Sequence, residues 1–466
     1  MKDKARLGVV GAGYVGLPTA AGFASLGHRV VCIDSNRDRV EQLRAGRSVI
    51  RELGLDELLE PQRRSGRLQF FEDFEALRRS DIVLLSVPTP SLPGTGAVDL
   101  EQVRRAVAAV AGAISQPAVL AIKSTVPVGT GDALAEELRR QGSPLAVASF
   151  PEFFCEGSAV YDFFHPSRLV VGAEVEWAAD AMRELLEPFR DRCPVLVVDR
   201  RTAELVKYAS NAFLAMKVHY ANTVADFCEK TGADVDSVLR AVGLDPRIGG
   251  QFLRPGPGFG GSCFPKDIRA LIAMGREWGV PLDLVETTLR GNEMRQMALV
   301  QRILARLQKI SHPRAAVLGL AFKAGTDDCR ESPAIAIVEG LLAAGVTVAV
   351  SDPLAMEGAR RLLGERVLHA ANALAAARGS DVLVIGTENF PDLDLEGIRP
   401  AMRTAQIVDL RNAVAAERAA ELGFYYEGIG RPALATIPLP VSHPGAGEGE
   451  CAPLPQGRTR TGTTTR

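Results

Sequence analysis

The sequence predicts an α/β protein with two doubly wound, parallel-sheet domains joined by a central helical region. Strand-like apolar runs alternate with helical segments early in the chain, and the same alternation returns after residue 314. A proline-free stretch with helical periodicity separates them. The 466 residues allow about three domains, and a composition of 47% hydrophobic and 24% charged residues is that of a globular protein.

The chain opens with a strand, a glycine-rich turn, a helix and a second strand. An apolar run at 7–10 leads into the turn, a helical stretch continues to residue 27, and a second run at 29–33 ends at Asp34. Strand candidates follow at 81–87 and 118–122. This order predicts a parallel sheet.

The turn has the spacing GxGxxG, formed by Gly11, Gly13 and Gly16. Such a turn lets backbone N–H groups approach a pyrophosphate at a helix N-terminus, and Asp34 is placed to accept hydrogen bonds from a ribose diol. With its flanking strand and helix, the motif favours dinucleotide binding over a purely structural turn. The acidic Asp34 favours NAD over NADP, because it would repel a 2′-phosphate.

The middle of the chain predicts a long helix, and the second half again predicts alternating strands and helices. Residues 202–232 predict one long helix. Strand candidates then lie at 315–320, 346–350 and 381–385, with a helix opened by Ser332 as N-cap and Pro333. Similar Ser-Asp-apolar runs begin at residues 80 and 380, which predicts two Rossmann-like domains. Because the glycine motif occurs once, we expect the two halves to bind different ligands.

We therefore expect a dinucleotide-binding domain at 1–200, a central helical region at 201–295 and a second Rossmann-like domain at 296–437. The segment 438–466 is different: ten of its 29 residues are Gly or Pro and it has no aromatic residue. That composition predicts a disordered tail.

Charge and cysteine usage exclude several classes of protein. The 54 basic and 56 acidic residues give a net charge of −2, so neither nucleic acid nor a membrane is an expected partner. The seven cysteines are scattered without a CxxC pair and no HExxH occurs, which disfavours a disulfide framework and a bound metal. With a poor signal peptide and no apolar run of membrane-spanning length, a cytoplasmic location is expected.

The segment 256–267 is the richest in chemistry. Four glycines in six residues fold a tight loop, and Pro265 can open a helix. Cys263 would then lie at a positive helix terminus with Lys266 nearby, which favours a reactive thiolate. These neighbours favour a nucleophilic cysteine over a small buried apolar side chain.

Other polar residues are candidates with simpler alternatives. Lys207 and Asn211 lie four apart on one helix face and could reach a common oxygen, although a solvated polar stripe has the same spacing. Glu152 follows a strand-like run at 145–148, where a capping carboxylate is equally compatible. A charged cluster after a later strand is otherwise a solvated surface; it contains Lys323, Asp327, Asp328, Arg330 and Glu331.

At these residues the sequence resembles the nucleotide-sugar dehydrogenases of the UDP-glucose/GDP-mannose dehydrogenase family. The resemblance spans about residues 5–431; the matching stretches are 9–18, 86–90, 123–130, 151–153, 204–213, 255–267, 319–333 and 409–412. One departure is local: residues 50–54 replace the family's Tyr-Glu-Pro-Gly run.

The resemblance implies a four-electron oxidation of the sugar CH₂OH of UDP-glucose to the carboxylate of UDP-glucuronate, with two NAD⁺ reduced by a homodimer. The presence of a reactive cysteine agrees with this reaction, because a simple alcohol dehydrogenase needs no thiol, whereas a second hydride can leave once a thiol has added to the aldehyde. Cys263 would form first a thiohemiacetal and then a thioester with the sugar carbon. The form of the cysteine loop favours UDP-glucose over GDP-mannose, and Lys266 argues against N-acetylhexosamines.

The resemblance also implies residue roles. Glu152 serves the water-dependent steps, Lys207 and Asn211 stabilise the oxyanion, and Asp267 holds a water with Lys207 that Thr125 positions. Implied cofactor contacts are Gly11, Gly13, Gly16, Asp34, Thr89, Thr125, Glu156 and Arg330. Implied substrate contacts are Phe153, Lys207, Asn211, Phe259, Gly260, Lys323 and Arg411, with Arg247 supplied by the neighbouring subunit; the second Rossmann-like domain would bind the nucleotide sugar.

Three alternatives remain at this stage. The first is the same chemistry on GDP-mannose. The second is a two-electron dehydrogenase of the 2-hydroxyacid type, which would also use a lysine and an asparagine on the central helix but has no use for Cys263 or a second Rossmann-like domain. The third is a non-enzymatic NAD-sensing protein, against which the apparently complete set of reactive residues counts.

Overall fold

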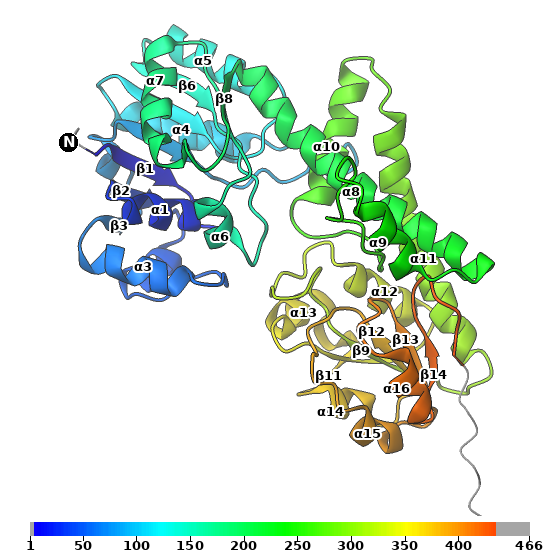
Figure 1. Ribbon diagram of the computed structural model, residues 1–466. Helices are drawn as coiled ribbons and strands as arrows, with labels where there is room; N and C mark the ends of the chain where they lie inside the picture. Colours follow the sequence, from blue (N-terminus) through cyan, green and yellow to red (C-terminus); the bar gives the residue numbers. More distant parts are fainter. Residues whose placement is uncertain (1–3, 435–466) are drawn as a thin grey trace, which may run out of the picture.

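The computed structural model describes residues 4–434, so the predicted disordered tail at 438–466 lies outside the described residues. Two sheet domains lie at opposite ends of a set of long helices (Figure 1). Within the described range, one sheet has eight strands and the other has six. This is the predicted architecture of two doubly wound domains around a helical region.

The first sheet has the order β3-β2-β1-β4-β5-β6-β7-β8. Its strands β1 to β6 pair in parallel, whereas β7 meets β6 in antiparallel fashion and then pairs in parallel with β8. The strands are β1 (Arg6–Val10), β2 (Arg29–Ile33), β3 (Leu68–Phe71), β4 (Ile82–Leu85), β5 (Ala118–Ile122), β6 (Leu145–Ser149), β7 (Leu169–Gly172) and β8 (Val195–Val198). The helices are α1 (Gly16–Ser25), α2 (Arg37–Arg44), α3 (Leu55–Arg64), η1 (Phe74–Leu77), α4 (Glu101–Ala113), α5 (Thr130–Arg140), α6 (Ala159–Phe164), α7 (Glu176–Leu185) and η2 (Glu187–Phe189).

The second sheet is parallel throughout, in the order β11-β10-β9-β12-β13-β14. Its strands are β9 (Arg314–Leu318), β10 (Thr347–Ser351), β11 (Leu368–His369), β12 (Val382–Ile385), β13 (Gln406–Asp409) and β14 (Tyr425–Glu427). Its helices are α12 (Pro333–Ala343), α13 (Met356–Leu363), η3 (Gly364–Arg366), α14 (Ala373–Ala377), α15 (Leu395–Ile398), η4 (Arg399–Ala401) and α16 (Ala416–Glu421). Each sheet has a hydrophobic core on both faces, as a doubly wound fold requires.

The two domains repeat one local device at their centres. Asp81 precedes β4 and accepts a hydrogen bond from the backbone N–H of Arg6, the first residue of β1. Asp381 precedes β12 and accepts the same bond from Arg314, the first residue of β9. The matching Ser-Asp-apolar runs of the sequence therefore occupy equivalent places, and each fixes the register of the two central strands.

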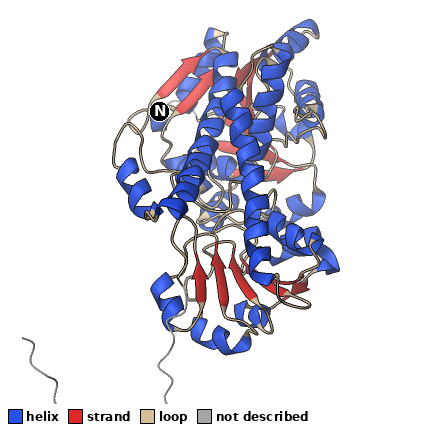
Figure 2. Ribbon diagram, turned by 90° about the vertical axis from the view of Figure 1, so that its right-hand side faces the viewer, coloured by secondary structure: helices blue, strands red, loops and turns tan. Residues whose placement is uncertain are grey.

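Long helices connect the domains. They are α8 (Arg200–Thr231), α9 (Val235–Gly243), α10 (Phe264–Glu277) and α11 (Asp283–Leu307). Helix α8 starts at the Asp199 cap and ends at Gly232 with φ 78°, a left-handed conformation that suits glycine. Its first half contacts β6 and β7, whereas its second half contributes Ala221 and Ala225 to the core of the second domain. Figure 2 shows the long helices running beside both sheets.

Candidate active site

A cavity of about 1000 Å³ opens at the carboxyl ends of the central strands of the first sheet. The turn after β1, the segments after β4 and β5, the cysteine loop and the turn before α12 all contribute to its wall. In a doubly wound sheet, ligands bind where the strand order reverses, here between β1 and β4. The cavity therefore lies at the expected binding position, between the two domains.

The glycine-rich turn fits a dinucleotide. Gly11 has φ 100°, and a Cβ on Gly16 would lie 1.8 Å from the Gly11 carbonyl oxygen, so both positions require glycine. A Cβ on Gly13, in contrast, would meet no described atom within 4 Å. This open face at the start of α1 is the cradle into which a pyrophosphate fits.

Asp34 lies at the end of β2 and is buried. Its carboxylate accepts hydrogen bonds from the backbone N–H groups of Ala12 at 2.8 Å and Asn36 at 2.9 Å, and from Arg39 at 3.1 Å. A carboxylate has about four acceptor sites, so Asp34 fixes the turn and still has capacity for a ribose hydroxyl. The fit of these groups supports a bound NAD.

The cysteine loop places Cys263 as the N-cap of α10, with Pro265 in its first turn, as predicted. The expectation of a resting thiolate was wrong. Burial raises the pKa of the Cys263 thiol to about 11, although the Lys207 ammonium opposes that rise. The opposing cation is therefore Lys207 rather than Lys266.

Lys207 and Glu152 form a buried ion pair, with Nζ and Oε1 2.8 Å apart. Burial disfavours both charges, but each stabilises the other: the pKa of Lys207 is raised, and the pKa of Glu152 is lowered by Lys207 and Lys123. The predicted alternative of a solvated stripe is wrong, because Lys207 is 3% and Asn211 6% exposed. Buried charges of this kind are typical of functional sites.

Asn211 and Asp267 are the second buried polar pair. The Asn211 amide donates to Asp267 Oδ2 at 2.7 Å, and Lys266 donates to Oδ1 at 2.5 Å. Asp267 is 1% exposed and lies in the first turn of α10, two residues after Pro265. The bond between Asn211 and Asp267 joins α8 to the first turn of α10, and the bond from Lys266 stays within α10.

Glu156 joins three segments. Its Oε1 accepts from Ser262 at 2.9 Å and from Arg330 at 3.2 Å, and Arg330 also pairs with the buried Asp328. Burial raises the pKa of Glu156 to about 7, and Asp328 adds to the rise while Arg330 opposes it. The charged turn after β9 is thus an ordered interdomain contact, so the interpretation as a purely solvated surface was wrong.

The remaining predicted residues fall into three places. Thr89, Thr125 and Phe259 line the large cavity, and the aromatic ring of Phe153 lies under the ammonium of Lys207. Gly260 approaches the turn at Glu331, described below. Away from the large cavity, Arg411 donates to the Phe322 carbonyl and Lys323 lies over the Phe322 ring, at the carboxyl edge of the second sheet. Arg247 is exposed and pairs with Asp245 of its own turn.

Sequence reasoning missed the residues that hold the cysteine loop. Asn292 brackets Phe259, accepting from its N–H at 2.8 Å and donating to its carbonyl at 3.0 Å. Arg295 donates to the Gly256 carbonyl at 2.5 Å, and Asn222 accepts from the Gly256 N–H at 2.8 Å. No motif marks these residues, and the only signal is polar side chains on the apolar face of a helix.

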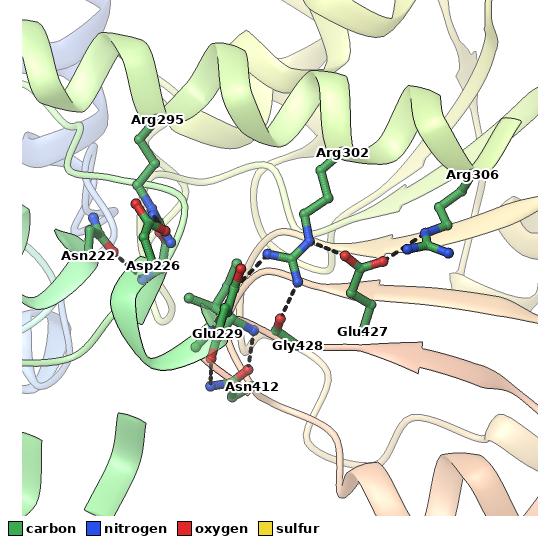
Figure 3. A network of polar contacts seen from close by, with 12 residues as sticks. Asn222, Asp226, Glu229, Arg295, Arg302, Arg306, Asn412, Glu427 and Gly428 are labelled. Carbon is green, nitrogen blue, oxygen red and sulfur yellow. Dashed lines mark hydrogen bonds and ion pairs between the residues drawn. The ribbon is translucent and has the colours of Figure 1, made fainter. Parts of the chain in front are cut away.

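Figure 3 shows how this support continues along α11. Arg302 donates to Glu229 of α8 and to Glu427 and the Gly428 carbonyl at the end of β14. Asn412, next to Arg411, exchanges hydrogen bonds with Ile429. Helix α11 therefore holds the cysteine loop and also the segment 427–428 after β14, whose neighbour Ile429 contacts Asn412.

Lys123 was recognised only as part of a matching stretch. It directly follows β5, is 4% exposed, and its ammonium lies 4.2 Å from the ring centroid of Phe150 and 5.1 Å from that of Phe154. Burial lowers the pKa of Lys123 to about 8, which Glu152 opposes and Lys207 reinforces. The sequence signal that could have identified Lys123 was its position directly after β5, a strand whose five residues are all buried.

Residues 4–434 hold no group of three or more His, Cys, Asp or Glu side chains arranged to bind a metal ion. In the same range, no helix combines the length and apolarity that crossing a membrane would need.

Comparison with known proteins gives consistent matches along the chain. Three models of the UDP-glucose/GDP-mannose dehydrogenase family match: the NAD binding domain at residues 5–190, the central domain at 201–294 and the UDP binding domain at 316–416. A UDP-glucose 6-dehydrogenase of Rhizobium meliloti is 44% identical over 92% of this chain and 100% of its own length. One of Pseudomonas aeruginosa is 42% identical over 92% and 98%. The solved UDP-glucose dehydrogenase of Pyrobaculum islandicum has a TM-score of 0.85 and 41% identity, covering 92% of this chain and 98% of that one.

Proposed function

The chain belongs to the UDP-glucose/GDP-mannose dehydrogenase family, and on that premise we propose that it oxidises UDP-glucose to UDP-glucuronate. The balanced reaction converts the CH₂OH group, two NAD⁺ and one water into the carboxylate, two NADH and three protons. NAD, when bound, supplies the hydride acceptor for both oxidations. The observation that carries the proposal is a half-buried thiol, Cys263, which lines the cavity of about 1000 Å³ and whose pKa the ammonium of Lys207 lowers.

The ion pair between Lys207 and Glu152 explains how Lys207 can act with and without a negatively charged substrate oxygen beside it. It holds a proton firmly, and Glu152 balances its charge while no substrate oxyanion is present. When Cys263 adds to the aldehyde, negative charge develops on the carbonyl oxygen, and the ammonium and the Asn211 amide are fixed donors for it. The thiohemiacetal then loses the second hydride to give a thioester.

Hydrolysis of the thioester needs a water close to Glu152. A second cavity of about 10 Å³ is lined by Thr125, Glu204 and Lys207, which is about the space of one water. A water in this cavity would lie beside Thr125 and Lys207, whereas Glu152 and Cys263 do not line it, so a role for Thr125 in placing the hydrolytic water stays a prediction. The structure gives Asp267 different partners, Asn211 and Lys266, so a water shared between Asp267 and Lys207 stays a prediction.

We also propose that the enzyme is a homodimer formed through α8. Phe213, Tyr220 and Phe227 recur every seven residues on this helix and are 57%, 52% and 70% exposed. Three large apolar side chains along one helix stripe are typical of a helix-mediated interface. Light scattering should give twice the chain mass; Phe213→Glu should halve that mass, and Leu368→Glu, exposed elsewhere, should leave it unchanged.

The decisive test of the reaction is stoichiometry with a panel of sugar nucleotides. UDP-glucose, UDP-galactose, UDP-N-acetylglucosamine and GDP-mannose are supplied separately at equal concentration, and NADH per mole of donor is measured. We expect two NADH from UDP-glucose and little from the others. A preference for GDP-mannose would overturn the substrate, and one NADH per donor would overturn the four-electron reaction.

The role of Cys263 has its own test. Cys263→Ser should bind NAD and UDP-glucose yet release no acid at a useful rate, because serine cannot replace the thiol as nucleophile and leaving group. Cys155→Ser is the matched control, since Cys155 is an exposed free cysteine on the segment after β6. Near-normal turnover of Cys263→Ser would refute the assignment.

A further inference from the structure

Next to the nucleophile, Ser262 and Glu156 form a hydrogen-bonded pair that reaches the sulfur. We propose that this pair is a proton relay, which takes the thiol proton of Cys263 as the sulfur bonds to a substrate carbonyl. The inference rests on the proposed function and deepens it by naming the base for the thiol step. Both residues line the large cavity together with Cys263.

The geometry sets the direction of the relay. The Ser262 hydroxyl donates to Glu156 Oε1 at 2.9 Å, and its oxygen lies 3.6 Å from Cys263 Sγ. A hydroxyl has one proton to donate and two lone pairs to accept with. Because that proton is committed to Glu156, the oxygen is the acceptor towards the S–H group.

The other two carboxylates near the thiol are already occupied. Glu152 accepts from Lys207 and from the backbone N–H of Phe154, and Asp267 accepts from Asn211 and Lys266. Both oxygens of each are therefore engaged with cations or fixed donors.

Glu156 differs, because no group of the described residues donates a hydrogen bond to its buried Oε2. After burial, Asp328 raises the pKa of Glu156 through its charge and through a side-chain hydrogen bond with the protonated carboxyl, whereas Arg330 and the Ser262 hydroxyl lower it. Tyr14 also lies close by, because the Glu156 charge raises its pKa. A pKa of about 7 suits a base that works near neutral pH, where the thiol with a pKa of about 11 cannot ionise by itself.

The step balances without any added group. The sulfur forms a bond to the carbonyl carbon, the S–H proton moves to the Ser262 oxygen, and the Ser262 hydroxyl proton moves to Glu156. The carbonyl π bond becomes an oxyanion, which Lys207 stabilises or protonates. No oxidation occurs here, and Glu156 later returns its proton to solvent.

The test uses the alkylation of Cys263 by iodoacetamide in the full-length protein without NAD or sugar nucleotide. Alkylation forms an S–C bond, expels iodide and releases the same thiol proton. Rates are measured from pH 6 to pH 11 by mass spectrometry of the Cys263 peptide, for wild type, Ser262→Ala, Ser262→Thr and Glu156→Gln. Melting curves verify that each variant folds.

The relay predicts a rate for wild type that rises through an inflection near pH 7, where Glu156 loses its proton. General bases contribute about 10²–10⁴-fold, so Ser262→Ala and Glu156→Gln should react at least about tenfold more slowly at pH 7.5. Ser262→Thr should keep the inflection, and all variants should converge near pH 11 as the thiol ionises directly.

Two results would overturn the relay. If Glu156 acted only through its charge, Glu156→Gln would remove a nearby negative charge and make Cys263 react faster at neutral pH. If Ser262 were only structural, Ser262→Ala would change the rate by the same factor at every pH. Neither readout needs turnover, so failure of the proposed function would appear separately, as absence of NADH from UDP-glucose.

Discussion

The contact between Gly260 and the turn before α12 gives a sharp prediction for the variant Gly260→Ala. Gly258 and Gly261 flank it with φ values of 119° and 83°, whereas Gly260 is outside the left-handed region, so alanine introduces no backbone strain there. The effect is purely steric. The new Cβ would lie 2.2 Å from the carbonyl oxygen of Glu331 and 2.8 Å from Cδ of Pro333.

The size of the effect follows from these distances. Carbon atoms in non-bonded contact settle at about 3.5–4.0 Å, so the loop and the turn must separate by about 1 Å. Neither can yield by a side-chain rotation, because one contact atom is backbone and the other is a proline ring. Cys263 is three residues further along the same loop, and a displacement of about 1 Å at reacting groups costs about 10²-fold in rate.

The assay is NADH formation from UDP-glucose at saturating NAD⁺, together with iodoacetamide labelling of Cys263 as a readout independent of turnover. We expect kcat to fall about 100-fold with an unchanged fold. Gly112→Ala is the matched control, because a Cβ at this position in α4 meets no described atom within 4 Å. Activity of Gly260→Ala within threefold of wild type would refute the steric argument.

Three further predictions concern charge. Asp34→Ala removes the acceptor for the Ala12 and Asn36 N–H groups and the charge that repels a 2′-phosphate, so the ratio of kcat/KM for NAD⁺ over NADP⁺ should fall at least about tenfold; an unchanged ratio would contradict this. The pKa of Glu156 is raised to about 7, so the contribution of this group to stability is fully present below the ordinary pKa of a glutamate and is lost as pH rises through about 7. Glu156→Gln, which cannot ionise, should therefore raise Tm relative to wild type at pH 8 but not at pH 4.5. Equal shifts of Tm at both pH values would refute this direction of the pH dependence. Arg302→Ala leaves Glu427 paired with Arg306 alone and removes the hydrogen bond to Glu229, so it should lower the free energy of unfolding by about 1.5–3 kcal/mol. The exposed control Arg361→Ala should cost under about 1 kcal/mol in the same denaturation experiment.

The fold could be predicted from the sequence because its signals are local and repeated. Buried parallel strands are indicated in the sequence by apolar runs, and α8 is indicated by a proline-free stretch with helical periodicity. The Asp81 and Asp381 devices were visible as matching runs before their hydrogen bonds were known. The antiparallel step from β6 to β7 was not visible, because strand direction depends on how the chain crosses the sheet and leaves no mark in a four-residue strand.

The candidate site was predictable only in part. Short-range patterns placed Cys263 as an N-cap and Glu152 at the end of β6, since both depend on neighbouring residues. Burial is a tertiary property, and it reversed the expected ionisation of Cys263. The supports from Asn292 and Arg295 reach across more than thirty residues, and a polar residue on a helix gives no hint of the loop it will hold.

The buried charges also explain why one carboxylate is accompanied by two lysines. Glu152 compensates Lys207 through a direct hydrogen bond, whereas Lys123 contacts only the faces of Phe150 and Phe154 among its described close partners. Burying the Lys123 ammonium beside two aromatic rings costs free energy, and the lowered pKa of Lys123 reflects that cost. That cost would fall if negative charge entered the cavity, as the proposed reaction requires when an oxyanion develops on the substrate. On the proposed reaction, the resting site would therefore bind the charge of the transition state more strongly than the neutral alcohol, and such a difference in binding accelerates a reaction.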